Sequence, residues 1–248
     1  MFVKSLLESE SKMASSIKTE TVDLKVSDGS SSMRAYVARP QKNLGLGLMV
    51  VQEAFGVNKH MREITERFAQ AGYLAISPEL FHRSAPPGFE IAYDKFEEVM
   101  PHIQAVTAPG IEADMKAAFN WLKENACEKV ASIGYCLGGR VSFMANSFLP
   151  LKAAISYYGG RIAPDLLPLA KKQNGPLLFF WGGQDKHIGT SQPRAIADEL
   201  LKENKTFTDV LISNADHGFS NNDKSVFNAK AEAQAWTLTL KFLEDSFA

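Results

Sequence analysis

The sequence predicts an α/β fold in which helices cover both faces of a mostly parallel sheet of about eight strands. From about residue 47 onward, short apolar runs alternate with segments of helical period, a pattern typical of βαβ units. Two extended runs come before them and flank a turn dipeptide. No internal repeat or long linker divides the 248 residues. We therefore expect one domain over residues 17–248, after a polar leader over residues 1–16 that is helical or disordered.

The leading strands are predicted to form an antiparallel hairpin. Runs of alternating or β-branched residues at 18–27 and 32–39 flank Asp28-Gly29, and a turn dipeptide between two such runs is a hairpin signal. Six further strands are predicted from apolar runs at residues 47–52, 73–77, 130–135, 153–158, 177–181 and 209–212.

Helices are predicted between these strands. Asn58, Thr190 and Asn222 are expected helix starts because Asn and Thr side chains cap free backbone N–H groups, and Gly72 is an expected helix stop. Residues 80–108 interrupt the rhythm with Pro86-Pro87-Gly88, so we expect a loop and then a short helix there. The predicted long helices cover residues 59–71, 110–126, 138–148, 191–204 and 226–246.

Composition excludes several classes of protein. Lysine and arginine number 27 against 28 acidic residues, a net charge of −1 that argues against a nucleic-acid partner. The longest apolar runs are far shorter than the roughly 20 residues of a membrane span. Two cysteines cannot build a disulfide framework, and the five histidines lack metal-site spacing. We expect a cytoplasmic protein without metal or cofactor, a monomer or small homo-oligomer.

The most informative segment is Gly134-Tyr-Cys-Leu-Gly-Gly139, where an apolar run passes into a helix. This is the layout of a nucleophile elbow, with Cys136 where serine usually stands. The flanking glycines leave space for a strained turn, and the positive end of the following helix favours a thiolate. A buried cysteine in a glycine-rich phosphate loop is the alternative. Cys127 has no such motif around it, so we expect a structural role.

Partners for Cys136 are expected after later strands, the acid before the base. Asp185 follows the run at 177–181, and His217 follows the run at 209–212. The order Cys136, Asp185, His217 is the one required, with His217 as base or ion-pair partner and Asp185 fixing its tautomer. His187 is a rival base and Asp216 a rival acid, although each is more simply a solvated loop side chain.

With these residues identified, the chain resembles the dienelactone hydrolase family from about residue 19 to the C-terminus. The nucleophile segment is one match. The others, in chain order, are Gln52-Glu-Ala-Phe-Gly-Val-Asn58 with Met61-Arg-Glu63, Pro78-Glu-Leu-Phe-His-Arg83 with Ala85-Pro86, Gly182-Gly-Gln-Asp185 and His217-Gly-Phe219.

The resemblance implies an α/β-hydrolase fold with a Cys-His-Asp triad. It implies that Glu53 lies against the nucleophile and takes part in forming the thiolate. It also implies that the N–H groups of Ala54 and Leu137 form the oxyanion hole. Arg83 is implied to bind a substrate carboxylate. Either Tyr157 or Tyr158 is implied to lie near the pocket.

One departure concerns substrate choice. The family carries a second arginine four residues after the catalytic histidine, and this chain has Asn221 there. We expect a hydrolase that cleaves an ester or lactone, such as an enol lactone, through an acyl-thioester on Cys136. With a single anchoring arginine, neutral substrates should be favoured. A cysteine-based redox or stress-response protein and a catalytically silent binding protein are the alternatives.

Overall fold

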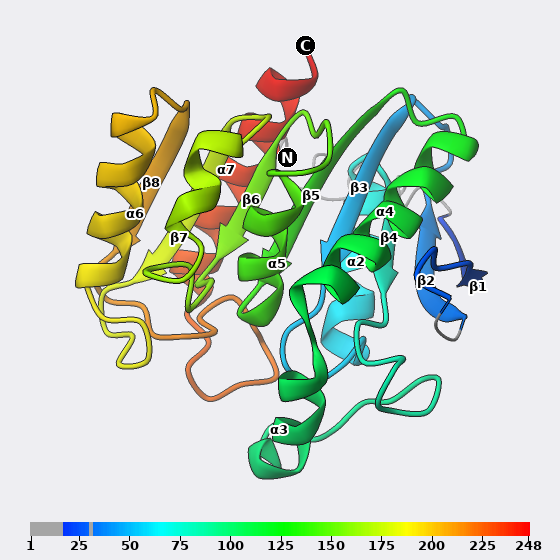
Figure 1. Cartoon of the computed structure of the whole chain (residues 1–248), viewed down its shortest axis with the longest axis horizontal. Helices are drawn as coiled ribbons and strands as arrows, with labels where there is room; N and C mark the ends of the chain where they lie inside the picture. Colours follow the sequence, from blue (N-terminus) through cyan, green and yellow to red (C-terminus); the bar gives the residue numbers. More distant parts are fainter. Residues whose placement is uncertain (1–16, 30–31) are drawn as a thin grey trace, which may run out of the picture.

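Eight strands form one sheet in the computed structural model, which describes residues 17–29 and 32–248. Their order across the sheet is β1-β2-β4-β3-β5-β6-β7-β8 (Figure 1). The leader expected over residues 1–16 lies outside the described residues. The strands are β1 (Lys18–Leu24), β2 (Met33–Arg39), β3 (Leu46–Val51), β4 (Leu74–Pro78), β5 (Lys129–Tyr135), β6 (Ala154–Tyr157), β7 (Leu177–Gly182) and β8 (Phe207–Ile212).

The sheet is antiparallel at one end and parallel elsewhere. β1 pairs antiparallel with β2, with Leu24 opposite Met33, so the predicted hairpin is confirmed. β2 also pairs antiparallel with β4, and all other neighbours are parallel. Parallel neighbours need crossover connections, which the predicted helices supply.

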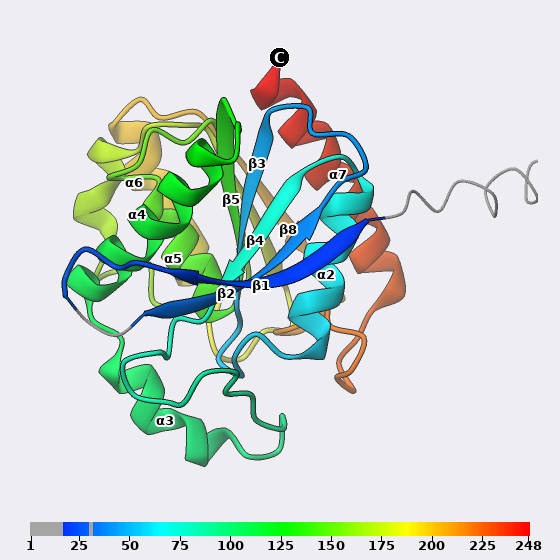
Figure 2. The ribbon, with the colours of Figure 1, turned by 90° about the vertical axis from the view of Figure 1, so that its right-hand side faces the viewer.

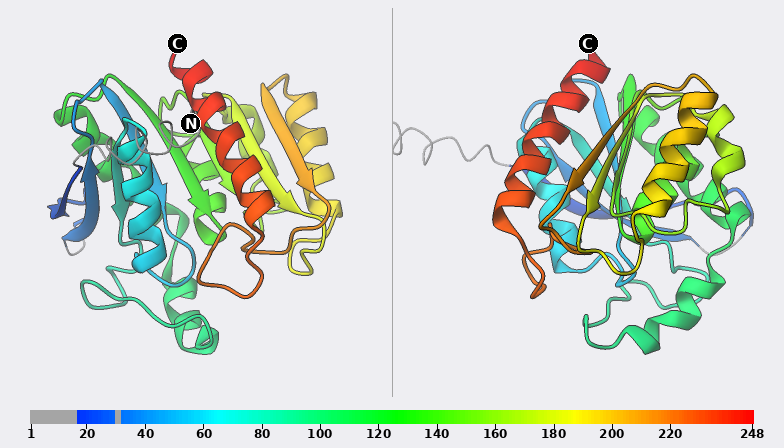
Figure 3. Two further views of the ribbon diagram at one scale, coloured as in Figure 1. Left: turned by 180° about the vertical axis from the view of Figure 1, so that it is seen from behind. Right: turned by 90° about the vertical axis from the view of Figure 1, so that its left-hand side faces the viewer.

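Helices cover both faces of the sheet, as predicted. α4 (Ala108–Glu124), α5 (Leu137–Ala145) and α6 (Ser191–Lys202) lie on one face, and α2 (Lys59–Gln70) and α7 (Ala229–Phe247) lie on the other (Figures 1 and 2). The view from behind shows α2 and α7 side by side across the central strands (Figure 3). The short helix predicted after the loop at 80–95 is α3 (Phe96–Ala105), which projects beyond the sheet. A 3₁₀ helix, η1 (Leu167–Lys172), lies between β6 and β7.

The helix ends follow local capping chemistry in most places. Asn58 caps α2 by accepting the backbone N–H of Met61 at 3.2 Å, and Gly72 follows the helix with a φ of 99° that favours glycine. Thr190 precedes α6, although its side chain makes no capping hydrogen bond. The predicted start at Asn222 is wrong. The residue that caps α7 is Asn228, which accepts the N–H of Ala231, and Asn222 lies in the preceding loop, where it contacts His60.

The core lies along the central strands, where both faces of the sheet are covered. Every residue of β4, β6 and β7 is buried, which explains why these segments read as continuous apolar runs rather than alternating ones. Loops from the carboxyl ends of the parallel strands gather at one edge of the sheet, where α/β folds place their sites. Within the described residues, no helix has the length and apolarity needed to cross a membrane.

Candidate active site

Cys136 occupies a strained turn between β5 and α5. Its φ of 54° and ψ of −114° place a non-glycine residue in a backbone region that side chains rarely adopt. The turn requires its glycines. A Cβ on Gly134 would lie 1.8 Å from the carbonyl oxygen of Gly138, and one on Gly138 would lie 2.2 Å from the carbonyl oxygen of Val51. The predicted elbow geometry at Cys136 is therefore present.

His217 and Asp185 meet at the same edge of the sheet. Asp185 follows β7, His217 follows β8, and Nδ1 of His217 lies 2.8 Å from Oδ2 of Asp185. The other oxygen of Asp185 accepts the backbone N–H groups of His187 at 2.8 Å and Ile188 at 3.0 Å. Burial raises the pKa of Asp185, but the bonds from His217 and these N–H groups outweigh it, so the net shift is downward.

The imidazole of His217 also interacts with the side chain of Cys136. Burial lowers the pKa of His217, but the interactions with Asp185 and Cys136 outweigh burial and raise it to about 10. A histidine between a carboxylate and a thiol is thus stabilised as the imidazolium. The structure brings all three predicted triad residues together.

The two rivals to the triad residues have supporting contacts instead. His187 donates its backbone N–H to Asp185, and its ring lies edge-on to His217 with centroids 5.4 Å apart. Asp216 accepts the backbone N–H of His217 at 2.7 Å. Neither contact gives His187 the position of a base or Asp216 the position of an orienting acid. Both residues help to fix the loops that carry Asp185 and His217.

Glu53 lies just after β3 and is completely buried. One carboxylate oxygen accepts the side-chain N–H of Asn221 at 2.8 Å and lies 3.1 Å from Nζ of Lys224. The other oxygen accepts the hydroxyl of Tyr158 at 3.4 Å and Nζ of Lys224 at 3.2 Å. A buried carboxylate needs such partners, since desolvating an unpaired charge is costly. Asn221, expected near a substrate, thus binds Glu53.

Lys224 and Tyr93 are site residues that the sequence did not reveal. Nζ of Lys224 lies over the rings of Phe55 and Tyr93, 5.0 and 4.9 Å from their centroids. The Tyr93 hydroxyl accepts the side-chain N–H groups of Asn58 and Asn221, and burial leads the effects that raise the pKa of Tyr93 to about 12. Both lie in loops without periodicity, so only the tertiary fold places them here.

The structure separates the two candidate tyrosines. Tyr158 packs against the His217 ring with centroids 5.1 Å apart and ring planes inclined by 57°, and its hydroxyl lies 2.8 Å from that of Ser220. Tyr157 turns the other way, and its hydroxyl lies 2.8 Å from that of Thr239 on α7. Of the two, Tyr158 is therefore the one beside the triad.

Arg83 is not brought to the triad. Its guanidinium forms two hydrogen bonds to the buried carboxylate of Asp114, at 2.7 and 2.8 Å, and two more to Asp28, at 2.6 and 3.1 Å. The bond to Asp114 leads the effects that raise the pKa of Arg83. Two carboxylates already compensate this cation, so the expectation that Arg83 anchors a substrate carboxylate finds no support in its contacts.

The implied oxyanion-hole residues flank the elbow. Leu137 is the first residue of α5, a position whose N–H has no acceptor within its helix. Ala54 follows β3, and β3 pairs with β5 so that Val51 lies opposite Gly134. The two backbone segments therefore leave the sheet beside each other, on either side of Cys136.

Comparison with known proteins identifies the family of the chain. The family model described as "Dienelactone hydrolase family" matches residues 33–247. This chain belongs to the dienelactone hydrolase family. A protein of Synechocystis sp. is 31% identical over 237 residues, which cover 87% of this chain and 95% of the relative.

Two other relatives span nearly the same length. The "Carboxymethylenebutenolidase" of Pseudomonas putida is 30% identical over 229 residues, covering 91% of this chain and 96% of the relative. A crystal structure of a dienelactone hydrolase homologue from Klebsiella pneumoniae superposes with a TM-score of 0.81 at 26% identity, covering 92% of this chain and 99% of that one. The resemblance found in the sequence is confirmed, and so is the α/β-hydrolase fold.

Among the described residues, no group of three or more His, Cys, Asp or Glu side chains could hold a metal ion.

Proposed function

We propose that this dienelactone hydrolase family member cleaves a carboxylic ester or lactone through an acyl-thioester on Cys136. The observation that carries the proposal is the strained elbow cysteine in contact with His217, which Asp185 holds at 2.8 Å. A cysteine that only senses oxidants has no need of this carboxylate–imidazole pair.

The reaction begins with the thiolate of Cys136 and the imidazolium of His217. The sulfur attacks the substrate carbonyl carbon and a C–S bond forms, while the N–H groups of Leu137 and Ala54 stabilise the oxyanion. Collapse of this intermediate breaks the C–O bond, and the leaving oxygen takes a proton from His217. Cysteine suits a good leaving group such as an enolate, because a poor alkoxide leaves less readily than the thiolate itself.

Deacylation returns the enzyme to its starting state. His217, now neutral, removes a proton from water, and the resulting hydroxide attacks the thioester carbonyl. The C–S bond breaks, the carboxylic acid is released, and the thiolate of Cys136 again faces the imidazolium. Asp185 holds the ring in one orientation through both half-reactions.

Glu53 is proposed to help form the thiolate, and its contacts define its resting position. Its carboxylate is bound by Lys224, Asn221 and Tyr158. Burial raises the pKa of Tyr158, and the electrostatic interactions with Glu53 and Cys136 act in the same direction. These contacts hold the Glu53 carboxylate in an ion pair with Lys224. Because Lys224 is neutralised by Glu53, it offers no free cation to a substrate.

The pairing of the cations in the site favours neutral substrates. Arg83 is compensated by Asp114 and Asp28, Lys224 by Glu53, and position 221 carries an amide. Among the described residues, an anionic substrate would therefore meet no unpaired cation at positions 83, 221 or 224. We propose neutral esters and lactones as the preferred substrate class.

The test is a screen of the purified protein against p-nitrophenyl acetate and a panel of lactones, with two matched cysteine variants. Cys136→Ala should abolish turnover. Cys127→Ala should retain it, because Cys127 is buried and burial raises the pKa of its thiol to about 11. Iodoacetamide should inactivate the protein with a single modification, at Cys136. Wild-type activity in Cys136→Ala would overturn the proposal.

A further inference from the structure

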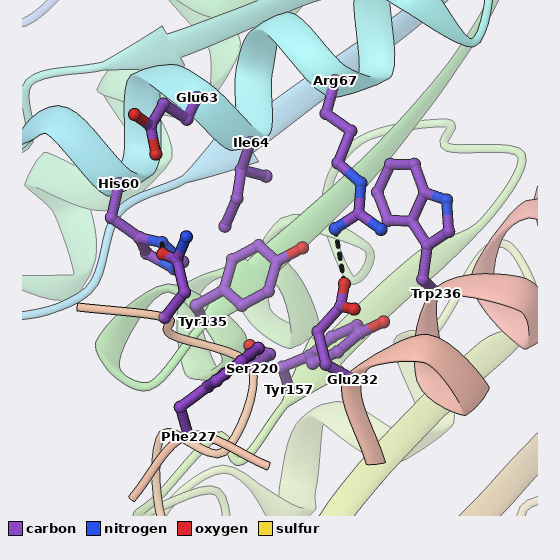
Figure 4. A pocket seen from close by; sticks show the side chains of 11 residues that line it. His60, Glu63, Ile64, Arg67, Tyr135, Tyr157, Ser220, Phe227, Glu232 and Trp236 are labelled. Carbon is purple, nitrogen blue, oxygen red and sulfur yellow. Dashed lines mark hydrogen bonds and ion pairs between the residues drawn. The ribbon is translucent and has the colours of Figure 1, made fainter. Parts of the chain in front are cut away.

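A second pocket lies on the opposite face of the sheet from α5, between α2 and α7. Its volume is about 260 Å³. Tyr135 and Tyr157 form its floor, Arg67 and Trp236 one wall, and the loop through Ser220 and Phe227 another (Figure 4). Ser220 separates it from the candidate active site, since the Ser220 hydroxyl contacts Tyr158, which in turn contacts Glu53. The mechanism proposed above uses no group that faces this pocket.

The polar groups of the pocket lie side by side. Arg67 and Glu232 form an ion pair, and the guanidinium lies 3.8 Å above the ring of Trp236 (Figure 4). The phenol of Tyr135 extends across the middle of the pocket toward this pair (Figure 4). Tyr135 is 2% exposed overall, and its hydroxyl reaches the open space of the pocket, where no described group pairs with it. A bound molecule can therefore form a hydrogen bond with this hydroxyl.

The charges of the pocket select against an anion. Arg67 is the single lysine or arginine among the described lining residues, whereas two carboxylates, Glu63 and Glu232, line the pocket. Burial lowers the pKa of His60, which disfavours its charged form. A ligand that is neutral but carries a donor beside an acceptor can bind both Tyr135 and Glu232. Its carbonyl accepts the Tyr135 O–H, and its N–H donates to Glu232.

The aromatic walls define the rest of the ligand. Tyr135, Tyr157, Phe227 and Trp236 surround the pocket, and Ile64 adds an aliphatic side. For scale, a cavity of about 150 Å³ already accommodates benzene. A volume of about 260 Å³ therefore holds one substituted ring.

We propose that this pocket is a second ligand site, and that it binds a small neutral aromatic compound bearing a carboxamide or a similar donor–acceptor edge. The inference does not depend on the proposed hydrolysis, because it uses no residue of the triad.

Three isosteric probes test the chemistry. Benzamide carries the donor and the acceptor, acetophenone lacks the N–H donor, and benzoate replaces the amide by a charge. Each is titrated into the full-length protein, after Cys136 has been alkylated with iodoacetamide to block the candidate active site. NMR shifts of the Trp236 indole N–H and of the amides of Arg67 and Glu232 report on binding. We expect benzamide to bind at least fivefold more tightly than acetophenone or benzoate.

Two variants and a control make the test specific. Glu232→Gln leaves Arg67 without its carboxylate, so benzoate should gain at least fivefold relative to benzamide. Tyr135→Phe should weaken benzamide about threefold. Glu244→Gln, a change at an exposed residue of the same helix, should alter neither the benzoate-to-benzamide ratio nor the affinity for benzamide. If Glu232→Gln is poorly folded, the ranking of the three probes on the wild-type protein still decides.

Three results would overturn the proposal: no benzamide shifts at these residues up to its solubility limit, which means that the pocket holds water only; equal binding of all three probes; or an unchanged benzoate-to-benzamide ratio in well-folded Glu232→Gln.

Discussion

Two charged groups lie at the carboxyl edge of this sheet, and they are held in different ways. His217 and Asp185 are fixed by the ends of neighbouring parallel strands and by backbone N–H groups that bind Asp185. Glu53 is fixed by side chains from distant loops, above all Lys224 and Asn221. The first arrangement is built from strand ends and backbone, and the second from side chains.

The difference predicts separate consequences for activity and for substrate choice. A pair fixed by backbone contacts tolerates changes nearby but has no substitute for its own atoms. An ion pair fixed by side chains can be retuned by a single substitution, because each partner sets the charge that the other presents. We therefore expect the triad to determine the rate, and the Glu53–Lys224 pair to modulate it.

The largest effect is expected from the triad. His217→Ala and Asp185→Asn should each lower kcat/KM by about 10³–10⁴, and the double variant should lose little more, because the residues act as one unit. His187→Ala is the matched control and should cost less than tenfold. Steady-state kinetics with p-nitrophenyl acetate measures these losses. A larger loss in His187→Ala than in His217→Ala would assign the base to His187.

A smaller loss of activity is expected when Glu53 is changed. Glu53→Gln keeps the size of the side chain but removes its charge, so kcat should fall by roughly ten- to a hundredfold if Glu53 helps to form the thiolate. The rate of alkylation of Cys136 by iodoacetamide, measured against pH, should shift in the same variant. An unchanged alkylation profile together with an unchanged kcat would limit Glu53 to a structural role.

Substrate charge gives a sharper test of the ion pair. The ratio of kcat/KM for an anionic dienelactone to that for its neutral methyl ester should rise by about tenfold in Asn221→Arg, since one charge-assisted hydrogen bond adds about 1.5 kcal/mol or more. Lys224→Met should lower kcat/KM for both substrates alike, because it disturbs Glu53. A selective loss of the anionic substrate in Lys224→Met would show that Lys224 binds the substrate carboxylate.

Arg83 should matter for stability rather than for substrate choice. Arg83→Leu leaves the buried Asp114 with less compensation, so the free energy of unfolding should fall by about 2–4 kcal/mol. The ratio between anionic and neutral substrates should not change. Urea unfolding measures the free energy of unfolding, and steady-state kinetics with the same pair of substrates measures the ratio. A selective loss of the anionic substrate would restore Arg83 as an anchor.

The last prediction concerns the pH dependence of stability. The pKa of His217 is raised to about 10 in the folded state, above an unfolded value of about 6.5. A raised pKa stabilises the fold fully below the unfolded value, and this contribution is lost as pH rises toward 10. The free energy of unfolding should therefore decline between pH 6.5 and 10 by more in the wild type than in His217→Gln. Parallel declines would contradict the raised pKa.

Features set by neighbouring residues could be predicted from the sequence, and contacts between distant parts of the chain could not. The elbow at Cys136 and the strand-end positions of Asp185 and His217 follow from glycine spacing and apolar runs, and both are present in the structure. Lys224 and Tyr93 lie in loops whose composition gives no periodic signal, so their contacts with Glu53 and Asn221 arise only on folding.

The helix start expected at Asn222 is wrong for a tertiary reason. Asn222 resembles a helix cap in sequence, but Asn228 caps α7, because the intervening residues form the loop that carries contacts to His60 and Glu53. The ion pair of Arg83 with Asp114, on α4, likewise joins residues far apart in the chain, so the sequence could not predict it.

The central claim, an acyl-thioester on Cys136, can be tested directly by mass spectrometry. The protein is mixed with excess p-nitrophenyl acetate at mildly acidic pH to slow deacylation, quenched in acid, digested and analysed. We expect one acetyl group per chain, on the peptide that contains Cys136, with a matching burst of one p-nitrophenolate per site. Cys136→Ala should show neither, and Cys127→Ala both. Hydrolysis by the wild type with no acetylated Cys136 and no burst would contradict it.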